Sequence, residues 1–105
     1  DEARLAVDRR LFHAAAGEGD TAGLERAVRD GADVDFVNRH IGGRTALLGA
    51  CLAGWDRAVT LLLRLGADPS LGDSSGYTCL HGAAYQGRPA VIWALRAADS
   101  EGLIR

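Results

Sequence analysis

Apolar side chains recur along this chain at the spacing of short amphipathic helices. Leu80, Ala83 and Ala84 fall at positions i, i+3 and i+4, which places them on one face of a helix. Thr78 can cap the start of this helix through its hydroxyl, and Gly87 can end it in a left-handed conformation. The pattern therefore predicts one helix of about two turns between these two residues.

The same spacing predicts further helices elsewhere in the chain. They cover residues 21–30, 45–53 and 57–65, and one more begins near Pro89, whose missing N–H suits a first helical turn. Three of these helices, those at residues 21–30, at residues 57–65 and from Pro89 onward, are predicted to form an outer layer. Each carries an apolar stripe opposite charged residues, as expected for one buried face. The residues expected in these stripes are Leu24, Ala27 and Val28; Val59, Leu62 and Leu63; and Val91, Ile92, Trp93 and Leu95.

The first residues of the chain allow two interpretations. In one, Asp8 caps a helix that begins at Arg9. In the other, a longer helix runs over residues 1–16. The second interpretation directs four apolar side chains inward: Leu5, Leu11, Phe12 and Ala15.

A glycine-bounded segment is repeated at a fixed spacing. Residues 43–54 match residues 76–87 at an offset of about 33 residues, a period typical of a repeat architecture. A third copy at residues 12–19 precedes the second by the same period lengthened by two. The two extra residues fall within the segment 38–42.

The period and its core motif resemble the ankyrin repeat, whose core reads T-P-L-H-x-A. Residues 78–83 read T-C-L-H-G-A, with Cys79 in place of Pro, and residues 45–50 read T-A-L-L-G-A, without Pro or His. A second family signature, Gly-Ala-Asp, stands at residues 31–33 and 66–68. The resemblance covers about residues 8–99. It implies an all-α solenoid of stacked helix-turn-helix units joined by β-hairpin loops.

We therefore expect a single ankyrin-repeat domain over residues 1–105. Its repeats should span about 8–38, 39–73 and 74–105, with the lengthened hairpin in the second. The third is expected to be incomplete, because Asp99 stands where the next Gly-Ala-Asp should begin and Leu103 and Ile104 are still apolar. With no Met in the sequence, we expect a piece of a longer protein whose uncapped C-terminal edge can self-associate.

Composition narrows the classes of function. The net charge of −2 gives no reason to expect a nucleic acid. No apolar run approaches the length that a membrane-spanning helix needs, so membrane insertion is not expected. The chain has no Lys, which removes a Schiff-base or phosphate-loop lysine. Its two cysteines, Cys51 and Cys79, are interpreted as buried thiols in a reducing intracellular compartment, cytoplasmic or nuclear.

Candidate chemical groups have structural explanations. The resemblance implies that His81 is a hydrogen-bonding group that ties neighbouring hairpins, although its nearness to Cys79 leaves a weak alternative of a reactive thiol. Four acidic residues that lie near glycines are interpreted as residues of turns and helix caps: Glu18, Asp20, Asp33 and Asp35. We therefore expect no catalytic residue, no metal ligand and no cofactor, and the chain is not interpreted as an enzyme.

The resemblance places partner contacts on the hairpin tips and on the two residues before the glycine that ends the inner helix of each repeat. It implies protein–protein recognition, with a targeting or regulatory domain fused to an enzyme as the alternative. We also expect the lengthened tip to reach beyond the other tip and to suit a carboxylate beside an apolar group. The residues concerned are Arg39, His40, Ile41, Arg44, Leu52, Ala53, Ser74, Ser75, Tyr77, Tyr85 and Gln86, with Gly17 and Glu18 in the first repeat.

Overall fold

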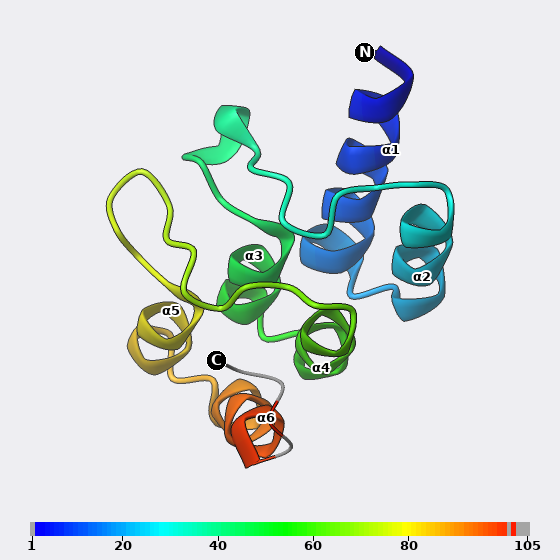
Figure 1. The fold of residues 1–105 in the computed structure, drawn as a ribbon. Coiled ribbons are helices and arrows are strands. Elements are labelled where there is room, and N and C mark those ends of the chain that lie inside the picture. The colour runs from blue at the N-terminus through cyan, green and yellow to red at the C-terminus, as the bar shows by residue number, and fades with distance from the viewer. Residues whose placement is uncertain (1, 101, 103–105) are drawn as a thin grey trace.

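The computed structural model describes residues 2–100 and 102, and within them the protein is helical with no strand (Figure 1). The predicted all-α fold is thereby confirmed. An isolated antiparallel bridge between Asn38 and Arg44 is what remains of a hairpin in the first long loop. The elements in chain order are α1 (Glu2–Phe12), the π-helical turn η1 (His13–Glu18), α2 (Thr21–Arg29), the 3₁₀ turn η2 (Arg39–Ile41), α3 (Ala46–Ala53), α4 (Asp56–Arg64), α5 (Cys79–Tyr85) and α6 (Pro89–Ser100).

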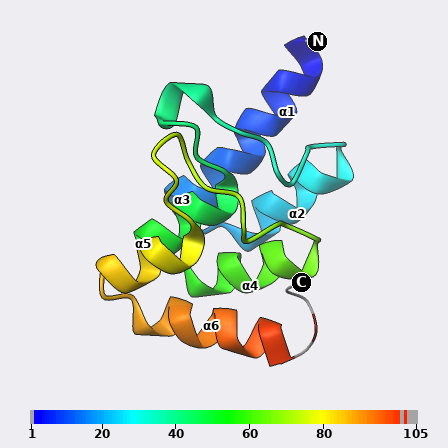
Figure 2. The same cartoon turned by 60° about the vertical axis from the view of Figure 1, so that its left-hand side comes forward.

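The helices form two layers. The inner layer stacks η1 on α3 and α3 on α5, and the outer layer stacks α2 on α4 and α4 on α6 (Figure 2). The two long loops lie side by side at one edge of the stack, where the Ser74 N–H donates to the Gly42 carbonyl at 3.0 Å. Each repeat therefore contributes one inner helix, one outer helix and one side of a continuous loop edge.

The helix boundaries follow from local chemistry. The Thr45 hydroxyl accepts the Leu48 N–H at 3.2 Å, and Asp20 accepts the Gly23 N–H at 3.0 Å, so both helices begin at a side-chain cap. Gly54 ends α3 with φ of 86°, a conformation that side chains disfavour. The helix starts and stops predicted from the repeat period are thus confirmed.

Glycine also sets how closely the inner helices pack. A Cβ added to Gly49 would lie 2.5 Å from the Cβ of Ala16, closer than two carbons can approach. One added to Gly82 would lie 2.8 Å from a methyl carbon of Leu52. A side chain at Gly49 would therefore push the inner helices apart, whereas one at Gly82 would displace the flexible end of Leu52.

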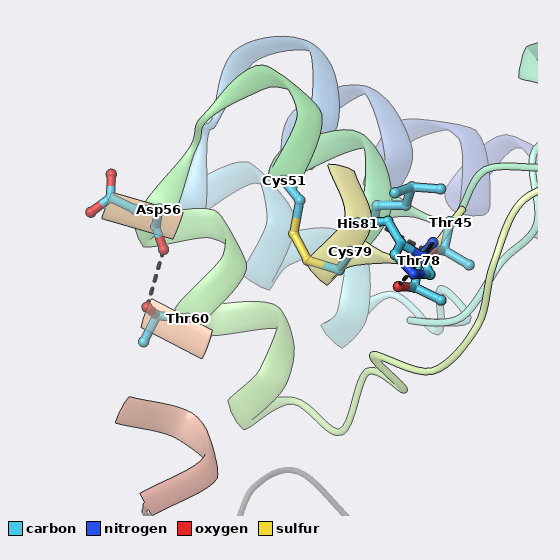
Figure 3. Close-up of a disulfide and its surroundings, with 8 residues drawn as sticks. Thr45, Cys51, Asp56, Thr60, Thr78, Cys79 and His81 are labelled. Carbon is cyan, nitrogen blue, oxygen red and sulfur yellow. Dashed lines mark hydrogen bonds between the residues drawn. A yellow bond between two sulfur atoms is a disulfide. The ribbon is translucent and has the colours of Figure 1, made fainter. Parts of the chain in front are cut away.

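Aspartates, rather than His81, tie the long loops to α1 and to each other. Asp8 accepts the backbone N–H of Asp33 at 2.8 Å, and Asp35 accepts that of Asp68 at 2.9 Å. The expectation that His81 ties neighbouring hairpins is wrong. Its Nδ1 instead accepts the N–H of Thr78 at 3.3 Å and lies 3.1 Å from the Thr78 hydroxyl (Figure 3). The histidine thus closes the start of its own helix.

At the N-terminus the longer helix is the one that forms. Leu11, Phe12 and Ala15 are buried, as this alternative requires. Leu5, which lies near the start of α1, is exposed instead. Asp8 does not begin the helix but lies inside it, where its buried carboxylate caps the Asp33 loop.

Of the apolar face expected for α5, which was Leu80, Ala83 and Ala84, only Ala83 is buried, and Ala84 is exposed like Leu80. The helix buries Cys79, Gly82 and Ala83, whereas Leu80 is 59% exposed. The equivalent residue of the preceding repeat, Leu47, is 2% exposed. Among the described residues α3 has an inner helix on both sides and α5 on one side only, which accounts for the difference.

The outer helix of the third repeat shows a similar pattern. Val91 and Leu95 are buried as expected, but Trp93 is 66% exposed and carries the Arg96 guanidinium over its ring at 5.8 Å. Leu103 and Ile104, expected in the same apolar edge, lie outside the described residues. The described part of this edge still leaves large apolar surfaces uncovered.

The two cysteines correct a further expectation. Cys51 and Cys79 are buried, but they are joined in a disulfide with their Cα atoms 5.6 Å apart (Figure 3). The two side chains meet because the stacking of α3 on α5 brings the later part of one helix against the first turn of the next. Their separation of 28 residues does not match the repeat period.

Candidate functional site

A basic groove opens on the inner face, between η1, α3 and the first long loop. Its volume is about 570 Å³. The expected contact residues that it brings together are Gly17, Ile41, Arg44, Leu52 and Ala53. The others that line it are Arg9, Phe12, His13, Ala16, Asn38 and Gly49.

The basic groove combines an apolar floor with a cationic rim. Phe12 is 7% exposed and Leu52 is partly buried, whereas Ile41 keeps 43% of its surface exposed. Arg9 is exposed and Arg44 is half-buried. In the described part of the chain no carboxylate lines the groove or pairs with either arginine. The groove can therefore offer guanidinium donors next to apolar surface.

The lengthened loop is closed by its own hydrogen bonds. The Asn38 N–H donates to the Arg44 carbonyl at 2.8 Å, and the Arg44 N–H donates to the Ile41 carbonyl at 3.1 Å. The Asn38 side chain also accepts the His40 N–H at 3.1 Å. The lengthened loop thus contains a compact 3₁₀ turn, Arg39–Ile41, and its Ile41 and Arg44 line the groove.

An aromatic patch lies on the third repeat. Tyr77 meets His81 edge-on with ring centres 6.1 Å apart, and it meets Tyr85 edge-on at 6.4 Å. Tyr85 is 77% exposed. Ser75, Gly76 and Ala84 complete a depression of about 600 Å³ with these three rings. The Asp73 carboxylate fixes the loop by accepting the N–H of Tyr77 at 3.0 Å.

The remaining expected residues line neither depression. Arg39 and His40 belong to the exposed η2 turn, Ser74 packs against the first loop, and Gln86 follows α5 on the exposed surface. Glu18 pairs at 3.3 Å with His13, which lines the basic groove, but Glu18 itself does not line it. The expected set is therefore divided into two depressions and a set of exposed flanking residues.

Sequence reasoning missed two residues that hold the inner face together. Trp55 donates its indole N–H to the Ala16 carbonyl at 3.1 Å, and Arg88 donates its Nε–H to the Leu52 carbonyl at 3.3 Å. Each directly follows the glycine that ends an inner helix, and the two residues lie one repeat period apart in the sequence. That shared place in the repeat was the signal that could have found them. Arg9, which precedes the first copy of the repeated segment, and Phe12 and His13, which begin it, were also missed as groove residues.

The described residues show little that could perform a reaction. They contain no cluster of three or more His, Cys, Asp or Glu side chains placed to hold a metal ion. Cys79, the weak candidate for a reactive thiol, is in the disulfide. Asp68 has its pKa held below the ordinary range, first by the Ser70 hydroxyl and then by the Ser70 N–H, which both donate to its carboxylate. This is turn chemistry.

A membrane-spanning segment is also missing from the described part of the chain, where every helix is too short or too polar to cross a bilayer.

Comparison with known proteins agrees with the repeat geometry. The family profile described as ankyrin repeats (3 copies) matches residues 11–102. The Notch-regulated ankyrin repeat-containing protein of Xenopus tropicalis is 32% identical over 85 residues, which cover 79% of this chain and 75% of that protein. The human protein of the same name is 31% identical over the same shares.

A much longer protein matches as well. The ADP-ribosylation factor GTPase-activating protein AGD2 of Arabidopsis thaliana is 36% identical over 77 residues, covering 73% of this chain but 10% of that protein. The match to the family profile extends over nearly all the stacked helices described above. The chain is therefore a member of the ankyrin-repeat family.

Proposed function

We propose that this chain is a protein-interaction module that binds a partner protein or peptide through its inner face and loop edge. The observation that carries the proposal is the pair of depressions on that face, with exposed Tyr77, Tyr85 and Ile41 at their rims. Tyrosine and arginine are the residue types that dominate binding energy in protein interfaces.

The rigidity of the stack supports the same proposal. Both loops are closed by backbone and aspartate hydrogen bonds, and the inner helices are tied to each other by Trp55 and Arg88. A surface that is ordered before binding loses little conformational entropy when a partner docks. The protein therefore presents a shaped surface without an accompanying fold change.

The experiment compares three versions of the protein as bait in quantitative affinity capture. Arg44→Ala with Tyr85→Ala alters the inner face, and Arg26→Ala with Arg57→Ala alters exposed positions of the outer helices. We expect partners to be lost with the first pair and kept with the second, at unchanged thermal stability. Loss with the outer pair alone would refute the chosen face.

The loop tip is tested by its own pair of substitutions. Arg39→Ala with Ile41→Ala should weaken partner binding by at least ~1 kcal/mol, because both side chains are exposed. Thermal unfolding should stay almost unchanged, since neither is buried in the core. Unchanged affinity would exclude the loop tip, including the Ile41 side of the basic groove, from the contact surface.

A narrower proposal follows from the name of the relatives, which ties those proteins to Notch. We propose a role for this chain in the regulation of Notch signalling. The support is identity of 31–32% along three quarters of each relative. A Notch-responsive reporter in cells that carry or lack the chain tests it, and an unchanged reporter would refute it while leaving a different partner open.

The compartment is also a proposal. We propose an intracellular setting, but the expectation of free thiols no longer supports it, because disulfides are uncommon in reducing compartments. Microscopy of a tagged chain, together with the thiol state of the protein recovered from cells, tests the location directly.

A second candidate is a targeting or regulatory domain within a longer protein related to enzymes. The match to AGD2, which this chain covers over a tenth of its length, favours it. The relatives covered along most of their length are named for ankyrin repeats and not for a reaction. The sequence of the complete transcript distinguishes these candidates.

A further inference from the structure

The acidic residues of this protein are largely engaged away from the basic groove. Six aspartates accept backbone N–H groups at helix starts and in loops: Asp8, Asp20, Asp33, Asp35, Asp68 and Asp73. Glu25 and Asp30 pair with arginines at the N-terminal part of the outer layer. A net charge of −2 therefore conceals a local excess of positive charge on one face.

That excess lies at the basic groove. Arg9 reaches it from α1 and Arg44 from the end of the first long loop, with Arg39 on the adjoining turn. In the region that the structure describes, none of these three guanidinium groups has a carboxylate within ion-pair distance. Their positive charge is thus available to a ligand.

The floor beneath the arginines is apolar. Phe12 and Leu52 form it, and Ile41 covers one side. A volume of about 570 Å³ is within the range of sites that bury a ligand. An apolar floor favours a ligand with apolar side chains, and the guanidinium groups favour carboxylates, which they can bind through two parallel hydrogen bonds.

We infer that the basic groove binds an acidic peptide segment in which Asp or Glu flanks an apolar side chain. The apolar side chain enters between Ile41 and Leu52, and the carboxylates pair with Arg9 and Arg44. This inference rests on the proposed function and specifies the chemistry of its partner. A nucleic acid is less well matched, because its phosphates would leave the apolar floor without a partner.

The test uses a random-sequence peptide library displayed on phage and the folded protein as target. We expect the selected sequences to be enriched in Asp and Glu next to Leu, Ile or Phe. Affinity of the selected peptides, measured by fluorescence polarisation, should fall at least about tenfold with Arg9→Glu plus Arg44→Glu. It should be retained with the charge-matched control Arg26→Glu plus Arg57→Glu on the outer helices.

Further measurements keep the result interpretable. Arg9→Gln with Arg44→Gln removes the charges without reversing them, and circular dichroism checks that each variant folds. Replacing the acids of a selected peptide by Asn and Gln should weaken binding as the arginine variants do. Affinity should also decrease as salt is raised, since exposed charge pairs are screened.

Several outcomes would overturn the inference. One is the selection of peptides that lack Asp and Glu and that lose binding with Tyr85→Ala but not with the arginine pair. That result would exclude an acidic ligand and keep the inner face as the interaction surface. A single-stranded oligonucleotide that binds through Arg9 and Arg44 more tightly than any peptide would also overturn it. So would a library that yields no binding peptide. The affinity capture described above then tests the proposed function separately.

Discussion

The substitution Gly49→Ala tests how the inner helices are stacked. The added methyl carbon would lie 2.5 Å from the Cβ of Ala16, whereas carbon atoms in contact prefer about 3.5–4.0 Å. Ala16 has no side-chain rotamer that could move away, so η1 and α3 would have to separate by roughly 1 Å. Overpacking of this kind costs about 1–3 kcal/mol.

The helix itself would gain from the change, since Ala is favoured over Gly inside a helix by about 1 kcal/mol. We expect the clash to be at the upper end of its range because both partners are backbone-fixed carbons. The net loss is then about 2 kcal/mol, or roughly 8 °C in the melting temperature for a chain of this size. Urea unfolding followed by circular dichroism measures it.

Two controls separate the clash from other effects. Ala16→Gly removes the opposing methyl group, so in the Gly49→Ala background it should recover at least about 1 kcal/mol relative to additivity. Gly82→Ala meets the flexible end of Leu52 at 2.8 Å, which can move, and should cost less. A Gly49→Ala protein as stable as the original, or an additive double variant, would refute this account of the stacking.

Three other predictions concern the disulfide, a loop and the last repeat. Reducing Cys51–Cys79 should lower the free energy of unfolding by about 3–4 kcal/mol, given the loop that it closes; alkylation of both residues without reductant, seen by mass spectrometry, would contradict the bond. Ser70→Ala should raise the pKa of Asp68 toward its ordinary value in an NMR titration. Because the folded pKa is lowered, the stabilisation from Asp68 exists at neutral pH and is lost as pH falls through that value. Leu80→Glu should reduce self-association in sedimentation, and a monomer at high concentration before substitution would refute that prediction.

The helices and their ends could be predicted from sequence because they are fixed locally. Threonine caps, glycines at helix ends and a constant repeat period place α3 and α5 without reference to the rest of the fold. Burial was less predictable for Leu80, since the same motif position is covered in one repeat and open in the next. Exposure depends on neighbours, which the motif alone does not specify.

Only part of the candidate site could be predicted, because the repeat motif indicates a residue's place in the repeat but not its neighbours. Ile41, Arg44 and Leu52 were found from their place in the repeat, and the structure brings them together. Arg9 belongs to the first helix, where the repeat pattern is weak, so no periodic signal indicated that it shares their groove. The Cys51–Cys79 bond was missed because it joins different positions of two repeats across the stacking interface.

Site-specific photocrosslinking tests the central claim, that the inner face binds the partner, most directly. A photoreactive amino acid is placed at Tyr85 on the inner face and, in a second protein, at Arg57 on the outer layer; both side chains are exposed. The account predicts crosslinks from position 85 to a partner protein or peptide, with mass spectrometry identifying the attached segment, and none from position 57. Crosslinks to a partner from position 57 alone would contradict it.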